Sequence, residues 1–143
     1  MNLPEEIARL EAMHRELLGL AQGCLRILQE ERFDDLDEAW AKRGRVFERI
    51  EAASRRLAPS FGEWASASAA LTPDQRNQAG RLIDSIRQTG GKVLALDKEI
   101  ATLIEKHQAS LASEIKRIDN GKQLINAYST SALKGPMKIS KMG

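Results

Sequence analysis

Only a few residues in this chain have side chains at the separations that catalysis or metal binding requires. Glu11 and His14 stand three residues apart, which is half of the pattern that a carboxylate-bridged dimetal site needs on two helices. The second half is missing, because Ile104 stands three residues before His107, the other histidine. We therefore expect His14 to be a structural residue on a helix seam, and we predict no metal site and no cofactor.

The remaining candidates also favour structural roles. Arg43 and Asp97 fall on apolar helical stripes, where ion pairing is far more common than catalysis, and helix lengths place Asp97 near Arg32. The single cysteine, Cys24, cannot form an intrachain disulfide and is expected to be a core thiol. The sequence has no glycine-rich phosphate loop and no Ser/His/Asp or Cys/His arrangement. Nothing here supports an enzyme.

Composition predicts a single all-α domain. The chain has 143 residues, 29% of them charged and 4% aromatic, with abundant Ala, Leu, Glu, Lys, Arg and Gln, which favour helices. All four prolines fall at the edges of the predicted segments. These features predict an antiparallel helical hairpin packed on a long third helix, as an elongated three-helix bundle or coiled coil.

Charge and hydropathy limit the classes of partner. Residues 1–71 have 10 basic and 13 acidic residues, whereas residues 72–143 have 12 and 7. No aromatic residues interleave with the C-terminal lysines, so we expect no nucleic-acid binding and interpret 129–143 as a flexible basic tail. Glu5 and Glu6 are unlike a signal peptide, and no apolar run approaches the ~18 residues of a membrane span. We expect a cytoplasmic protein without membrane insertion.

The hairpin is predicted over residues 1–57. Its first helix, from Leu3 to Gln29, has a stripe with alternating steps of four and three: Leu3, Ile7, Leu10, His14, Leu17, Ala21, Cys24 and Leu28. A turn at Phe33–Asp35 contains an aspartate that can cap the second helix, Leu36–Leu57. The stripe of the second helix consists of Leu36, Trp40, Arg43, Phe47, Ile50, Ser54 and Leu57. We expect Trp40 and Phe47 to form the bulky core.

A loop rich in Ala and Ser is predicted over residues 58–72, followed by a helix over 73–128. Thr72 and Gln75 have the spacing of a capping box, with Pro73 in the first turn. Gly90-Gly91 leaves two alternatives open. Either the helix continues and another backbone packs closely at Gly90, or the helix bends there.

The third helix is too long for the hairpin to cover. At about 1.5 Å per residue, a helix antiparallel to the second one reaches its far end near residues 92–97, and about 30 residues remain. That remainder has apolar residues on one helical face, and such a face marks an interaction surface. The predicted partner-binding residues are Leu103, Ile104, Leu111, Ile115, Ile118, Leu124, Ile125 and Tyr128.

Three segments of the sequence resemble FlgN-type flagellar export chaperones. They are Leu94-Ala-Leu-Asp97-Lys-Glu-Ile-Ala-Thr-Leu103-Ile-Glu-Lys, then Ile118-Asp-Asn-Gly121-Lys122-Gln-Leu-Ile-Asn126-Ala127-Tyr128, and Phe33-Asp-Asp-Leu36 with the helix after it. The resemblance implies a cytoplasmic helical chaperone that binds hook-associated proteins through its C-terminal helical region. It also implies that Tyr128 takes part in docking to the export gate.

Two functions from different classes remain open. The first is an export chaperone that holds an amphipathic cargo helix against the third helix. The second is a coiled-coil scaffold in which the uncovered stripe pairs with a second copy of the chain. The mass in solution discriminates between them, because a monomer with an exposed stripe favours the chaperone.

Overall fold

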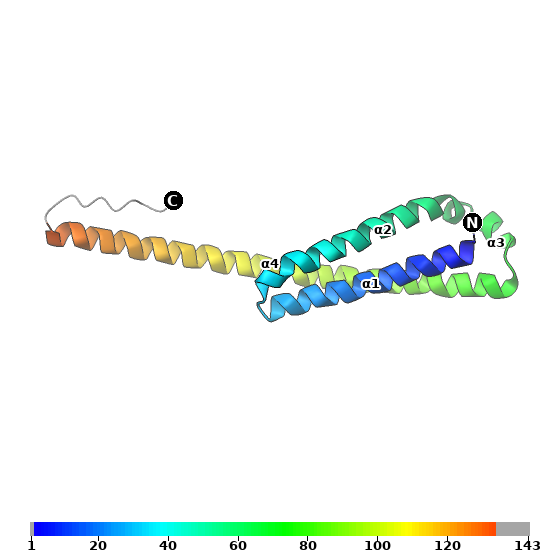
Figure 1. The fold of residues 1–143 in the computed structure, drawn as a ribbon, viewed down its shortest axis with the longest axis horizontal. Coiled ribbons are helices and arrows are strands. Elements are labelled where there is room, and N and C mark those ends of the chain that lie inside the picture. The colour runs from blue at the N-terminus through cyan, green and yellow to red at the C-terminus, as the bar shows by residue number, and fades with distance from the viewer. Residues whose placement is uncertain (1, 134–143) are drawn as a thin grey trace. The chain divides into compact units, whose positions relative to one another are not determined.

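The part of the chain that the structure describes consists of helices joined by short turns. This computed structural model describes residues 2–133, with side-chain surroundings for residues 2–123 and 125. Its elements, in chain order, are α1 (Leu3–Gln29), the 3₁₀ turn η1 (Phe33–Asp35), α2 (Leu36–Gly62), α3 (Trp64–Ala69) and α4 (Pro73–Leu133) (Figure 1). No strand occurs among residues 2–133, and the predicted all-α class is confirmed.

Internal contacts divide the chain into two units, residues 1–102 and residues 103–143. The first unit contains α1, η1, α2, α3 and the part of α4 that ends at Thr102. The second unit contains the part of α4 from Leu103 onwards. Each is described by itself.

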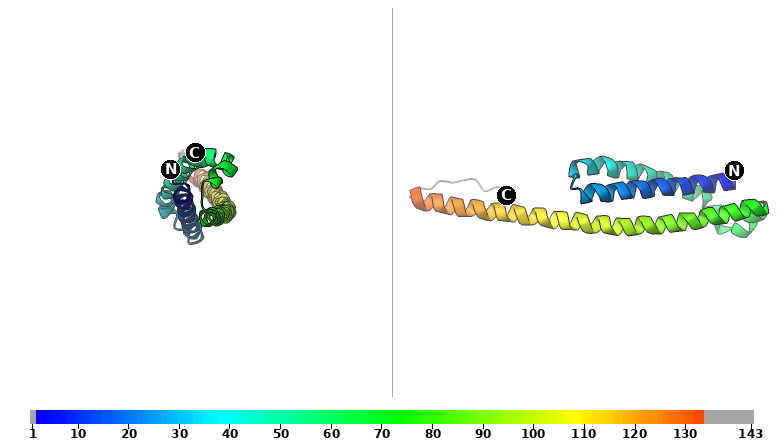
Figure 2. Two further views of the ribbon diagram at one scale, coloured as in Figure 1. Left: turned by 90° about the vertical axis from the view of Figure 1, so that its right-hand side faces the viewer. Right: turned by 90° about the horizontal axis from the view of Figure 1, so that it is seen from below.

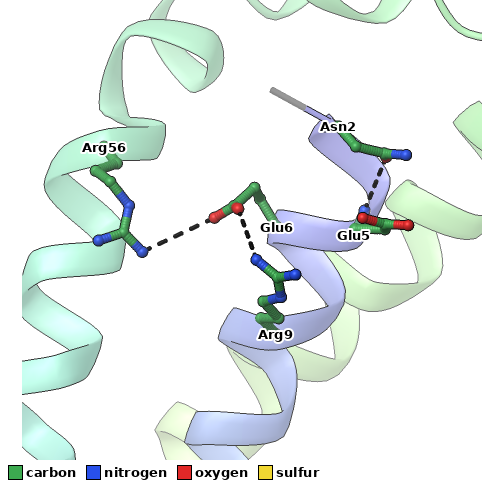
Figure 3. Close-up of polar contacts among 5 residues, drawn as sticks. All are labelled: Asn2, Glu5, Glu6, Arg9 and Arg56. Carbon is green, nitrogen blue, oxygen red and sulfur yellow. Dashed lines mark hydrogen bonds and ion pairs between the residues drawn. The ribbon is translucent and has the colours of Figure 1, made fainter.

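Helix α1 starts with a side-chain cap. The backbone N–H of Glu5 donates to the side-chain oxygen of Asn2 at 3.2 Å, and the acidic Glu5 and Glu6 lie in the first turn. Glu6 also pairs with Arg9 at 3.0 Å and with Arg56 of α2 at 3.8 Å (Figure 3). The start of α1 is thereby linked to the C-terminal half of α2.

The core of the first unit lies between three helices. α1 and α2 run antiparallel, with the first part of α4 alongside them (Figures 1 and 2). Seven of the eight predicted stripe positions of α1 are buried, and His14 is half-buried. The other helices contribute Val46, Ile50, Ala53 and Leu57 from α2, and Ala79 and Val93 from α4. This is the predicted hairpin packed on a third helix.

The buried stripe of α2 differs from the predicted one. Trp40 and Phe47 are 45% and 48% exposed, so the expectation that they form the core is wrong. Val46 and Ala53 are buried in place of Phe47 and Ser54. Ile50 and Leu57 are buried as predicted, but Val46 and Ala53 complete the buried face on the side away from Phe47, so the two large rings remain at the surface.

The segment predicted as a loop over 58–72 is largely helical. α2 continues to Gly62, so Pro59 lies inside it rather than beyond its end, and α3 covers Trp64–Ala69. Alanine is the strongest helix former, and this segment is rich in it. The half-buried Phe61 and Trp64 pack against the core and hold the segment in place.

The N-terminus of α4 has the predicted capping box. Gln75 donates its backbone N–H to Thr72 Oγ1 at 3.2 Å, and Thr72 donates its own to Gln75 Oε1 at 3.0 Å. α4 is helical through Gly90 and Gly91, and a Cβ built at either meets no heavy atom within 4 Å. No closely packed backbone therefore explains these glycines.

Burial within the first unit reaches further along α4 than the length argument predicted. Ile100 is 1% exposed, although intrachain packing was expected to end near residues 92–97. The predicted neighbour of Asp97 is also wrong, because Asp97 pairs with Arg43. Arg32 pairs instead with Asp35 at 3.0 Å. The side chain of Asp35 makes no hydrogen bond that caps α2, contrary to expectation.

Candidate partner-binding site

The predicted partner-binding residues all belong to the second unit. Leu103 and Ile104 are half-buried. The side chains of Leu124 and Tyr128 lie outside the described residues. The remaining four are exposed large apolar residues: Leu111 at 44%, Ile115 at 59%, Ile118 at 55% and Ile125 at 63%.

The four exposed residues share one face of α4. Their steps of four, three and seven keep them aligned, and they extend over about 21 Å of helix. Single exposed apolar residues are ordinary on protein surfaces, whereas a row of large ones marks a contact surface. We call Leu111, Ile115, Ile118 and Ile125 the exposed stripe.

Charged residues accompany the exposed stripe along the same helix. Glu114, Lys116, Arg117 and Lys122 are all exposed. This segment of α4 is therefore amphipathic, with a polar side in water and an apolar side that is also in water.

Glu11, half of the dimetal pattern, has a structural role. Ser85 Oγ of α4 donates to Glu11 Oε1 at 3.0 Å, and Arg15 pairs with Glu11 Oε2 at 2.9 Å. Burial lowers the pKa of His14 below 6.5, and the charge of Glu11 partly opposes this effect. Among the described residues, no group of three or more His, Cys, Asp or Glu side chains could hold a metal ion.

Cys24 is fully buried, as predicted for a core thiol. Burial raises the pKa of the Cys24 thiol; the charge of Arg43 acts in the opposite direction and that of Asp97 in the same direction. A raised pKa leaves the thiol protonated and unreactive. Cys24 of α1, Arg43 of α2 and Asp97 of α4 therefore form a packed structural site within the first unit.

Two further surfaces were not predicted from the sequence. Trp40, Phe47 and Leu94 are exposed in the first unit. A pocket lined by Phe61 and Trp64 also lies in that unit, which we call the Phe61–Trp64 pocket. Two aromatic residues close together in an Ala/Ser-rich segment were the one signal available for it.

The first unit is a small helical bundle and the second unit has an exposed apolar face, a feature that is typical of interaction surfaces. Comparison with protein families identifies the class. A family model described as flagellar protein FliT matches residues 4–130. The chain therefore belongs to the FliT family, whose members are type III export chaperones for hook-associated proteins and not enzymes. No curated protein and no solved structure matches the chain significantly.

This result confirms the chaperone class and corrects the family. FlgN-type chaperones, which three segments of the sequence resemble, form a related but distinct family. The matching segments are short and belong mostly to amphipathic helices, and short helical segments do not discriminate between helical families. None of the described helices is long and apolar enough to cross a membrane.

Proposed function

We propose that this protein holds an amphipathic helix of a hook-associated protein against the exposed stripe, in the cytoplasm before export. The observation that carries this proposal is the exposure, between 44% and 63%, of four large apolar side chains on one helical face. Membership of the FliT family supports a hook-associated protein as cargo.

The mechanism is burial of apolar surface. Covering one large apolar side chain contributes roughly 1.5–3 kcal/mol, from which the cost of ordering and docking the two partners is subtracted. A cargo helix with apolar residues at the same helical spacing can cover the whole stripe. While it is covered, that face of the cargo cannot pair with other subunits, which prevents early assembly.

The exchange Ile115→Asp tests this mechanism. A carboxylate in the centre of an apolar interface loses its hydration without gaining a partner, so affinity for cargo should fall at least about tenfold. Ser113→Asp is the matched control, because Ser113 is exposed and is not part of the exposed stripe. It lies two residues from Ile115, which is about half a helical turn and places it on the opposite side of α4. Calorimetric titration with purified hook-associated proteins measures affinity, and thermal melting of the same variants measures stability.

Both variants should melt close to the unmodified protein, because neither position is buried. Ser113→Asp should retain affinity. A large fall in melting temperature for Ile115→Asp with unchanged affinity would show that Ile115 belongs to a core, and the proposal would lose its basis.

Self-association is the alternative use of the same stripe. In that scaffold, two copies bury Leu111, Ile115 and Ile118 against each other. Sedimentation equilibrium measures the mass in solution, and this mass discriminates between the two functions. A monomer that binds cargo supports the chaperone, whereas a tight dimer that Ile115→Asp dissociates supports the scaffold.

Delivery to the export gate is the second step of the proposed function, with Tyr128 as the docking residue. Membership of a family of type III export chaperones supports this step, and Tyr128, the single tyrosine of the chain, lies within the residues that the family model matches. Tyr128→Ala should retain cargo affinity and lose capture by the soluble domain of the gate. Equal capture of both proteins would remove Tyr128 from this role.

A further inference from the structure

The Phe61–Trp64 pocket lies in the first unit, separate from the residues of the exposed stripe. Its volume is ≈ 640 Å³, within the range of about 300–1,000 Å³ that binding sites for small groups have. All four α-helices contribute to its walls, with Leu10 from α1, Phe61 from α2, Trp64 from α3 and Ile83 from α4. The proposed cargo surface does not account for it.

The apolar wall is built around two aromatic rings. The ring centroids of Phe61 and Trp64 are 6.1 Å apart at an interplanar angle of 38°, and both side chains are half-buried. Gly80 of α4 also lines the pocket, and a Cβ built there meets no heavy atom within 4 Å. The glycine therefore leaves room beside the rings that a larger residue would fill.

The polar wall has an excess of positive charge. Arg76, Arg87 and Asp84 line the pocket. Arg87 and Asp84 are 3.9 Å apart and largely exposed, which makes a weak pair. Arg76 pairs with no carboxylate of the described part of the chain. One guanidinium is thus available to a ligand, and guanidinium groups favour carboxylates because two N–H groups can bind two oxygens.

We propose that the Phe61–Trp64 pocket binds an acidic segment of a partner protein. An apolar aromatic side chain of that segment enters beside Phe61 and Trp64, and a neighbouring carboxylate binds Arg76. Charge complementarity supports an acidic occupant, and the joint presence of an aromatic wall and a free cation supports a peptide that carries both groups. The protein then has two partner surfaces, one in each unit.

The experiment uses two tripeptides as probes, acetyl-Asp-Phe-Asp-amide and acetyl-Lys-Phe-Lys-amide. Each is titrated into the full chain, and the NMR signal of the Trp64 indole N–H is followed. The acidic peptide should shift that signal in a saturable manner and bind about tenfold more tightly than the basic one. Arg76→Glu should reverse the preference, and it leaves the fold intact because Arg76 is exposed.

Gly80→Leu places a large side chain at the pocket wall, where a Cβ meets no heavy atom within 4 Å, and it gains helix propensity. It should abolish binding of the acidic peptide. Gly91→Leu is the matched control, since Gly91 lies in the same helix, has equally open space and does not line the pocket. It should retain binding, as should Ile115→Asp.

Two results overturn the proposal: no saturable shift of Trp64 with the acidic peptide, or equal affinity of Gly80→Leu and the unmodified chain. Because Ile115→Asp is measured with both cargo and peptide, failure of this pocket is distinguishable from failure of the exposed stripe.

Discussion

The two parts of α4 have the same apolar period, and they differ in whether that face is covered. In the first unit, Val93 and Ile100 stand seven residues apart and are almost fully buried. In the second unit, Ile118 and Ile125 stand seven residues apart and are more than half exposed. A helical period therefore predicts an apolar face, whereas its burial depends on a second element lying against it.

The difference separates a part of α4 that contributes to folding from a part to which the proposed function assigns binding. Ala79, Val93 and Ile100 are buried in the first unit, so their transfer from water contributes to folding. The exposed stripe has its apolar surface in water, so it contributes little to folding.

The largest expected contrast is in amide hydrogen exchange. Amides near Leu17 and Ile50 should exchange only through global unfolding, because both residues lie in the core. Amides beyond Ile104 should exchange many times faster, because a helix without packing partners is marginally stable in water. Exchange measured by NMR in a verified monomer tests this. Uniformly slow exchange along the chain would contradict the contrast.

Identical substitutions in the two parts of α4 give the next largest effect. Ile100→Ala leaves a cavity in the core and should destabilise the protein by about 2–5 kcal/mol. Ile115→Ala removes the same atoms from an exposed position and should change stability by less than about 0.5 kcal/mol. Urea unfolding of both variants provides the measurement. Equal losses would show that the exposed stripe is packed.

Regular periodicity made α1 and the start of α4 predictable. The stripe of α1 keeps one phase for eight positions, so seven of them were correctly placed in the core. Thr72 and Gln75 form a local motif whose hydrogen bonds depend on nearby residues alone. In α2, by contrast, Val46 and Phe47 are adjacent and both apolar, so periodicity could not decide which one faces the core.

Tertiary contacts account for what the sequence could not predict. The pairing of Arg43 with Asp97 joins residues 54 positions apart, and no local pattern selects Asp97 over another acid. The Phe61–Trp64 pocket likewise needs Leu10, Trp64 and Ile83 to meet in space. The spacing of the exposed stripe could be predicted because it depends on the residues of a single helix, and its exposure was expected from the length of that helix.

Gly91→Ala should stabilise the protein by about 1 kcal/mol, since α4 is helical there and a Cβ meets open space. Gly121→Ala makes the same change in the second unit, where a Cβ also meets open space. It should slow local amide exchange around residue 121 and leave the urea midpoint unchanged. Destabilisation by Gly91→Ala would mean that the chain needs positive φ at this position.

The smallest expected effect is a pH dependence confined to the first unit. The pKa of His14 is lowered from 6.5, chiefly by burial, so the unfolded chain binds a proton more readily than the folded one. The contribution of neutral His14 to the free energy of unfolding is therefore fully present above pH 6.5. It is lost as the pH falls through 6.5 towards the lowered pKa of His14. Glu11 and Arg15 are the charged residues close to His14, and the variants below leave both unchanged.

Urea unfolding at a series of pH values should show a smaller fall in stability for His14→Leu than for the unmodified chain. His107→Gln, in the second unit, should retain the full dependence, because it leaves His14 unchanged. An identical slope in His14→Leu would assign the acid sensitivity of the bundle to its carboxylates.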